Sequence, residues 1–386
     1  MSTPTRWELV ERALREADPE EVVEVLGEAL RENYGVRDCE MFLVDLRLVV
    51  LEPVVHRDAP SIPLAGTAAG RAYRDQAAIV GEHEGRTALH LPLAVRGDRM
   101  GVLQLVTDED LSAEIRAELL DIAEVVAGLV LTAEVVTDRY RQVRRRHRLT
   151  LAAEMQWQLL PVRSVETRSF RLAGQLEPAY AVRGDNFDWS QDGRTLSVAV
   201  TNGMGESLTA SMLTTLAITA LRNARRGGAD LVDQAALADQ AIWSYHVGKQ
   251  YVSTLLIELD LRSGRLRVVD AGSPRMWRVR GDEIERIELD AQLPLGMLEE
   301  TEYQAQEFQL EPGDRLFVLT DGVYAAARAS RNYDVASLQR TLRASRLLPP
   351  AEAVRALMSD IRVFLADHDL DDDAVAVCLD WNGTDL

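Results

Sequence analysis

The sequence predicts an α+β protein of two domains joined by a long helix. Helical and strand-like patterns alternate along the chain, and neighbouring strand-like runs are separated by tight turns such as residues 96–99. A helical pattern without proline runs from about residue 112 to 159. With 386 residues, 47% of them hydrophobic and 27% charged, the chain is long enough for two domains with cores of their own.

The first half opens with an amphipathic helix at residues 19–32, with Asp18 as its N-cap and Pro19 at the first helical position. Strand-like runs follow at 40–45 and 48–54, a glycine-containing helical stretch at 66–74, and further runs at 90–95 and 100–106. The turn between the last two runs fits a hairpin.

This order of elements, closed by a long helix, resembles a GAF domain over roughly residues 15–133. The best local match is LPLAVRGDRMGVLQLV, where the family has a paired-strand motif. The resemblance implies a GAF-like α/β sensor domain at residues 1–133 that binds a small ligand or mediates dimerisation. The ligand is not named by the sequence.

Residues 134–158 are predicted to form a linker helix. An apolar stripe at spacings of three, four or seven residues runs through the long helical pattern: Leu119, Ile122, Val126, Leu129, Val136, Tyr140 and Val143. Such a stripe favours a coiled coil between two copies of the chain, so we expect a parallel homodimer. The alternative is that the stripe covers the chain's own domains.

The second domain is predicted at residues 159–386, with helices near 208–226 and 230–247 and strands near 251–260, 265–271 and 315–320. Four short polar segments stand at the edges of its apolar runs: residues 183–188, 201–207, 320–323 and 371–375. Three offer carboxylates and one offers an amide. Hard divalent cations take oxygen ligands gathered from several strand ends, so these segments predict a metal centre.

Residues 149–381 resemble the PPM-type, metal-dependent serine/threonine phosphatases, in particular their bacterial SpoIIE-like branch. Seven pieces occur in family order: AAEMQWQLLP, EPAYAVRGDNFD, NGMGESLTASML, STLLIELDLRSGRLRVVDAGSPRMW, PLG at 294–296, LEPGDRLFVLTDGV and DDDAVAV. The resemblance implies a fold of α-β-β-α layers and a centre of Mn²⁺ or Mg²⁺ ions that acidify a water for attack on a phosphoserine or phosphothreonine.

Matched position by position, the resemblance implies that Asp185, Asp321 and Asp373 are metal ligands and that the Gly203 carbonyl also ligates. Asn202 stands where the family has the aspartate that bridges both ions. A neutral amide offers one good oxygen and no charge, so we expect metal affinity to fall, with Asp188 or Asp372 as substitute ligands for a remaining ion.

Two more departures from the family pattern lie beside the centre. Arg183 replaces the first glycine of Gly-Gly-Asp, where its cation is placed to bind phosphate or replace metal charge, and Ser207 replaces the last glycine of the next turn. The leading interpretation is a degenerate phosphatase that binds its partner with weak or no hydrolysis. The alternative is an active Mn²⁺-dependent protein serine/threonine phosphatase.

The resemblance implies a phosphoserine partner of the anti-sigma-factor-antagonist type, or its kinase. The net charge of −19 argues against nucleic acid, despite the basic run at 139–148. No apolar run reaches the ~18 residues of a membrane span, and no signal region is apparent, so we expect a cytoplasmic protein. Cys39 and Cys378, in separate halves, are expected as reduced, buried thiols.

Overall fold

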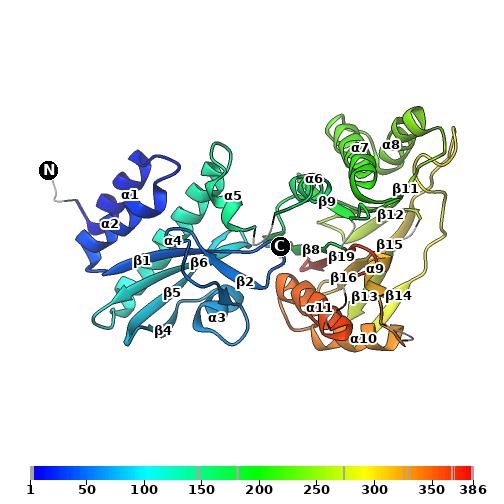
Figure 1. The fold of residues 1–386 in the computed structure, drawn as a ribbon. Coiled ribbons are helices and arrows are strands. Elements are labelled where there is room, and N and C mark those ends of the chain that lie inside the picture. Colours follow the sequence, from blue (N-terminus) through cyan, green and yellow to red (C-terminus); the bar gives the residue numbers. More distant parts are fainter. Residues whose placement is uncertain are drawn as a thin grey trace. The chain divides into compact units, whose positions relative to one another are not determined.

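The computed structural model describes residues 4–145, 148–179, 182–272, 274–324, 326–328, 331–366, 368 and 370–383. The chain divides into two compact units, Met1–Arg148 and Leu149–Leu386, and each is described by itself. In Figure 1 the first unit is coloured from blue to cyan-green and the second from green to red. The two units confirm the predicted α+β class.

Unit 1 is built on one antiparallel sheet in the order β3-β2-β1-β6-β5-β4. Its strands are β1 (Asp38–Val44), β2 (Val50–Pro53), β3 (Ile62–Pro63), β4 (Ile79–His83), β5 (Arg86–Val95) and β6 (Asp98–Thr107). Its helices are α1 (Arg6–Glu16), α2 (Val22–Tyr34), α3 (Ala68–Asp75), α4 (Ala113–Ala133) and α5 (Arg139–Val143). The β5–β6 hairpin confirms the predicted turn at 96–99.

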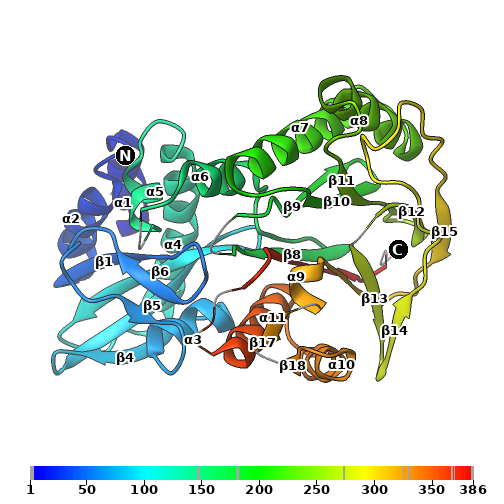
Figure 2. The ribbon, with the colours of Figure 1, turned by 45° about the vertical axis from the view of Figure 1, so that its right-hand side comes forward.

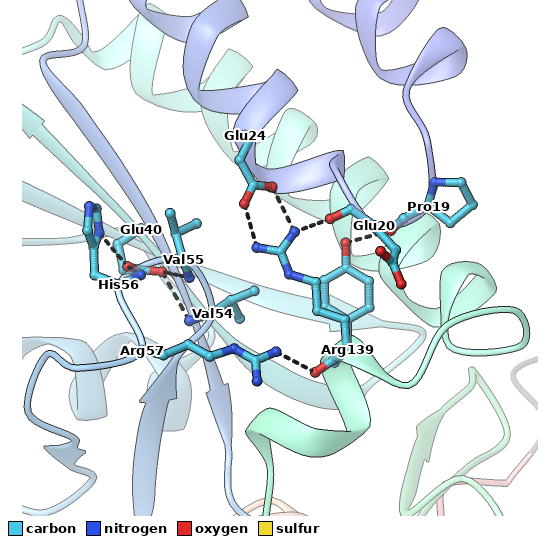
Figure 3. Close-up of polar contacts among 10 residues, drawn as sticks. Pro19, Glu20, Glu24, Glu40, Val54, Val55, His56, Arg57 and Arg139 are labelled. Carbon is cyan, nitrogen blue, oxygen red and sulfur yellow. Dashed lines mark hydrogen bonds and ion pairs between the residues drawn. The ribbon is translucent and has the colours of Figure 1, made fainter.

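Alternation along the strands supplies both faces of this sheet. Met41 and Leu43 pack into the larger core with α1, α2, α4 and α5, whereas Phe42 and Val44 face α3. Glu40 lies at a buried position of β1, where its carboxylate accepts three backbone N–H groups of residues 54–56 and the Nδ1 of His56 (Figure 3). The sheet therefore separates two apolar cores.

The predicted continuous helix across 134–158 is wrong. Helix α4 ends at Ala133, a turn follows, α5 covers only residues 139–143, and α6 (Leu151–Leu159) belongs to unit 2. Residues 146 and 147 of the predicted linker lie outside the described residues. The boundary between the units consequently falls inside the predicted linker, after residue 148.

Tertiary contacts hold α5 on unit 1 in place of helix continuation. Arg139 binds the Glu24 carboxylate at 2.9 and 2.5 Å and the carbonyl of Glu20 (Figure 3). Tyr140 is fully buried and donates its hydroxyl to the carbonyl of Pro19 at 2.8 Å. These contacts override the helical propensity of the intervening residues.

The apolar stripe packs mostly inside unit 1. Leu119, Ile122 and Val126 are buried in the larger core, together with Tyr140 and Val143, while Val136 is 72% exposed. The stripe therefore covers its own domain, which was the alternative to a coiled coil. The homodimer stays a prediction without this support.

Unit 2 contains two antiparallel sheets, in the orders β15-β12-β11-β10-β9 and β14-β13-β16-β19-β8-β7. The strands of the first are β9 (Asn186–Asp192), β10 (Thr195–Gly203), β11 (Val252–Asp260), β12 (Arg265–Ala271) and β15 (Gln306–Gln309). Those of the second are β7 (Ser164–Glu166), β8 (Phe170–Glu177), β13 (Arg275–Arg280), β14 (Glu283–Ile287), β16 (Arg315–Leu319) and β19 (Ala374–Trp381). A short β17 (Ala327–Arg328) pairs with β18 (Arg331–Asn332).

Helices cover the outer faces of these sheets, as Figure 2 shows. These helices are α7 (Ser207–Arg226), α8 (Leu231–His246), α10 (Val335–Ala344) and α11 (Pro350–Leu365). Helix α6 packs against α7, and the single turn α9 (Asp321–Tyr324) follows β16. One core fills the space between the sheets, a second lies under α7 and α8, and a third under α10 and α11. This arrangement confirms the α-β-β-α layers.

Of the helices in the described part of the chain, none combines the length and apolar character that a bilayer crossing requires. Cys39 and Cys378 are both buried and free, as expected, and burial raises the pKa of each thiol.

Candidate metal centre

The four polar segments meet at one end of the two packed sheets. Residues 183–185 lead into β9, whose first residue, Asn186, pairs with Thr201 near the end of β10. In the other sheet, Leu319 at the end of β16 pairs with Ala376 of β19, so Thr320 and Asp321 lie beside Asp373. Antiparallel pairing within each sheet thus gathers segments from four parts of the sequence.

Asp373 is fully buried, and its carboxylate is saturated with hydrogen bonds. It accepts five: from the side-chain amide of Gln156 at 2.6 Å, from the backbone amides of Ala179, Arg183 and Gly184 at 2.8 Å each, and from that of Asp185 at 3.3 Å. Four of these reach a single oxygen, Oδ2, which exceeds the lone pairs of one carboxylate oxygen. Although burial raises the pKa of Asp373, these N–H groups oppose that shift.

Asp185 is equally buried, yet neither of its carboxylate oxygens has a hydrogen-bond partner among the described residues. Burial, followed by the charge of Asp373, raises its pKa well above the usual range. The Thr320 hydroxyl lies near enough to lower this pKa without reaching hydrogen-bond geometry. A buried carboxylate whose two oxygens accept no hydrogen bond is the feature of this centre that best fits a bound cation.

Asn202 and Asp321 contact each other directly. The Asn202 Nδ2 donates a hydrogen bond to Oδ1 of Asp321. Because a carboxylate only accepts, the amide must turn its nitrogen toward Asp321. The position expected to bridge two ions is instead a donor to one of the expected ligands.

Two glycines let these segments approach closely. A Cβ on Gly203 would lie 2.5 Å from the Thr214 hydroxyl oxygen and 3.0 Å from the Gly184 carbonyl oxygen. That hydroxyl, on α7, donates to the same carbonyl at 2.5 Å. A Cβ on Gly322 would lie 2.0 Å from the carbonyl oxygen of Asp373. The turn that carries Asp321 is therefore pressed against the start of β19.

Arg183 and Asp188 have partners of their own. The Arg183 guanidinium pairs with Glu206 at 2.8 Å; the Arg183 side chain is 37% exposed and that of Glu206 is 60% exposed. Asp188, on β9, is buried and pairs with Arg222 at 2.8 Å and Arg225 at 2.9 Å, both on α7. Asp188 therefore fastens α7 to β9 and is not free to serve as a substitute ligand.

Asp372 is the other neighbouring carboxylate. Burial, and then the charge of Asp321, raises its pKa to about 6.

Gln156 is a residue of this centre that the sequence did not predict; besides its bond to Asp373, it donates a hydrogen bond to the Asp185 carbonyl at 2.8 Å. Its motif, AAEMQWQLLP, was recognised, but no spacing in the sequence indicated that this amide reaches Asp373.

The residues present do not fit a pair of ions. The Asp373 oxygens are engaged by N–H groups, and Asn202 supplies no bridging charge. No cluster of three or more His, Cys, Asp or Glu side chains in the described ranges has metal-binding geometry. Asp185 is the exception, since its free oxygens fit one cation.

The second unit is similar in sequence to known proteins. The sequence profile of stage II sporulation protein E (SpoIIE) matches residues 192–382, so Arg183, Asp185 and Asp188 lie before the matched segment. Stage II sporulation protein E of Bacillus subtilis strain 168 is 25% identical over 206 residues, which are 52% of this chain and 24% of that protein. The protein of the same name from Priestia megaterium is 24% identical over 194 residues, 49% of this chain and 33% of the relative. The alignments thus span a quarter to a third of these relatives.

Two solved structures are similar to this chain at lower sequence identity. The PP2C phosphatase domain of SpoIIE from Bacillus subtilis, with a fragment of its regulatory domain, is 21% identical with a TM-score of 0.49, covering 56% of this chain and 66% of that one. The SiaA-PP2C domain of Pseudomonas aeruginosa is 19% identical with a TM-score of 0.49, covering 54% and 85%.

The second unit contains a SpoIIE-like domain, which matches the family profile over residues 192–382. Two curated proteins named stage II sporulation protein E align with about half of the chain.

Proposed function

We propose that the chain is a signalling regulator whose SpoIIE-like domain binds a phosphoserine protein of the anti-sigma-factor-antagonist type, or the kinase of that protein, with weak or no hydrolysis. The observation that carries this proposal is the hydrogen bond from Asn202 to Asp321. In this bond Asp321, an expected metal ligand, accepts a hydrogen bond from the neutral side-chain amide of Asn202.

The physical argument is the loss of bridging charge. Two divalent ions side by side repel each other, and a shared carboxylate offsets that repulsion while giving each ion an oxygen. At an effective dielectric of about 20, charges 4 Å apart interact by about 4 kcal/mol. An amide at this position therefore lowers the affinity for the second ion by orders of magnitude. We expect at most one Mn²⁺ or Mg²⁺ ion, held weakly beside Asp185.

Unit 1 is proposed to be a GAF-like sensor that binds a small ligand, in a cytoplasmic and homodimeric protein. Its support is the sequence resemblance together with a six-stranded sheet that has helices on both faces. Thermal shift of the full chain with a nucleotide and metabolite set tests it, because a ligand that binds the folded state raises stability. Stability unchanged with every compound would contradict this part of the proposal.

Hydrolysis of a phosphoserine protein with Mn²⁺ tests the degenerate centre. We expect little activity in the wild type and a gain of at least about tenfold in Asn202→Asp, because the bridging charge is restored. Asn223→Asp, at an exposed position of α7, adds the same charge elsewhere and should leave activity unchanged.

The second candidate is an active Mn²⁺-dependent serine/threonine phosphatase, and the open oxygens of Asp185 favour it. It predicts brisk wild-type turnover that is lost in Asp321→Ala. Calorimetric titration of Mn²⁺ separates the two candidates, since two tight sites in the wild type would contradict the proposal of a degenerate centre.

A further inference from the structure

A cleft of about 270 Å³ lies beside the metal centre, lined by residues of β12, β13, β14 and α9. Its charged lining residues are Asp270, Arg275 and Arg286. Figure 2 shows β13 and β14 as a projecting hairpin, and β13 also pairs with β16. The volume is below the ~300–1,000 Å³ of typical small-molecule sites, so the cleft fits a group of side-chain size rather than a cofactor.

Arg275 is the best-placed cation of this cleft. Its guanidinium carbon lies 3.8 Å from the centre of the Tyr324 ring, so the ring fixes the plane of the charged group. Farther along β13, Arg278 pairs with Glu285, and Arg280 pairs with Glu311 and Asp314. No carboxylate among the described residues pairs with Arg275. On a chain of net charge −19, a half-buried arginine without an acidic partner is a charge left for a ligand.

Arg286 supplies a second cation of this cleft from the neighbouring strand β14, where it pairs in register with Trp277. It forms a loose ion pair with the exposed Glu288 at 3.6 Å, and its charge also acts on Asp270 of the same cleft. Asp270 is buried and its Oδ1 accepts the Gly272 amide at 3.0 Å. Burial raises the pKa of Asp270, and the Gly272 amide and the charge of Arg286 oppose that shift. Two guanidinium groups match a phosphate monoester dianion better than a single carboxylate.

The cleft shares a rigid element with the metal centre. Arg275 pairs in register with Leu319, two residues before Asp321. Helix α9 begins at Asp321 and ends at Tyr324, so one helical turn carries both the Asn202 acceptor and the platform under Arg275. A group in the cleft is therefore held next to the centre without touching its carboxylates.

We propose that this cleft is an oxyanion site that takes the phosphoryl group of a phosphorylated side chain on a protein partner, independently of metal. This proposal rests on the proposed function in one respect, namely that the ligand is a phosphorylated protein. Failure of the hydrolysis experiment above leaves this proposal standing, because the cleft needs neither metal nor turnover.

Calorimetric titration of the full chain in EDTA with a phosphoserine peptide of neutral flanks tests the proposal. We expect binding that weakens at least about tenfold in Arg275→Gln and in Arg286→Gln, because each removes a charge-assisted contact. Asp270→Asn should tighten it. Arg262→Gln, an exposed arginine in the turn between β11 and β12, should change the affinity by less than about twofold.

Further arms distinguish the source of binding. Asp321→Asn should retain affinity if the cleft, and not the carboxylate centre, holds the phosphoryl group. The same peptide with aspartate or serine in place of phosphoserine should bind at least about tenfold more weakly. Absent binding by the wild type, equal loss in Arg262→Gln, loss only in Asp321→Asn, or equal affinity for the aspartate peptide would each overturn the proposal.

Discussion

Asp185 and Asp373 are both fully buried, but they face opposite situations. Asp373 organises the loop before β9 by accepting backbone amides, whereas Asp185 has two open oxygens. The sequence could identify both as members of one constellation, because their motifs occur in family order. It could not distinguish their roles, since those depend on Gln156 and on where the backbone amides of Ala179 and of residues 183–185 lie.

At Asn202, sequence and structure give complementary information. The substitution itself is readable from the motif, and it predicts weaker metal binding. The structure adds the direction of the amide, which points its nitrogen at Asp321. That orientation follows from a neighbour 119 residues away, which no local pattern encodes.

The raised pKa of Asp372, about 6, predicts how the metal-free protein responds to pH. An unfolded aspartate titrates near ~3.9, so between about 4 and 6 the folded chain keeps a proton that the unfolded chain releases. The contribution of Asp372 to the free energy of unfolding is therefore largest below about pH 4 and falls as the pH rises through about 6. In EDTA, Asp372→Asn should gain about 1–2 kcal/mol on the wild type between pH 4 and pH 7, a figure reduced for its partial exposure.

Urea unfolding at the two pH values measures this gain. The exposed neighbour Asp371, changed to Asn, serves as the control and should show no such difference. A stability gain in Asp372→Asn that is the same at both pH values would contradict the prediction.

At the scale of elements, periodicity predicted several helices and strands, but the predicted N-cap at Asp18 was wrong, because α2 begins at Val22 with Glu21 at the N-cap position. The predicted helices at 208–226 and 230–247 correspond to α7 (Ser207–Arg226) and α8 (Leu231–His246), and the run at 100–106 lies within β6. Helices α10 and α11 were missed, although Val354, Leu357, Met358 and Ile361 stand at helical spacing behind Pro350. The break after α4 was missed because it depends on the long-range contacts of Arg139 and Tyr140.

A matched pair of substitutions tests the role of the apolar stripe. Val126 is fully buried in unit 1, and Val136 is 72% exposed. Val126→Asp should unfold unit 1 or cost several kcal/mol, because it buries an unpaired charge. Val136→Asp should change stability by less than about 0.5 kcal/mol.

Thermal melting and light scattering after size exclusion report both outcomes. A coiled coil would respond differently, since Val136→Asp would then dissociate a dimer while leaving each chain folded. That result would restore the linker-helix interpretation.

At the scale of the whole molecule, charge limits the partners. The chain carries 62 acidic and 43 basic residues. Within the basic run at 139–148, Arg139 is bound to Glu24 and Arg144 donates to the Val44 carbonyl at 3.1 Å. Two arginines of the run are thus engaged in contacts within unit 1.

Duplex DNA should therefore not bind at 0.15 M salt, because phosphate contacts require a patch of free cations and the long-range field is repulsive. Fluorescence anisotropy of a labelled duplex measures this. A complex that weakens steeply with added salt would show that the basic run is exposed after all.

Strand β19 lies between β16 and β8 and is the last strand of the second sheet to be synthesised. Its partner β8 precedes it by about 200 residues along the chain, with Phe170 paired to Trp381. Any nascent chain that stops short of residue 374 holds this sheet as two unjoined halves with bare edges, a state open to chaperones and to aggregation. Closure of unit 2 during translation is consequently a late event, and nonsense mutations near its end should be as damaging as early ones.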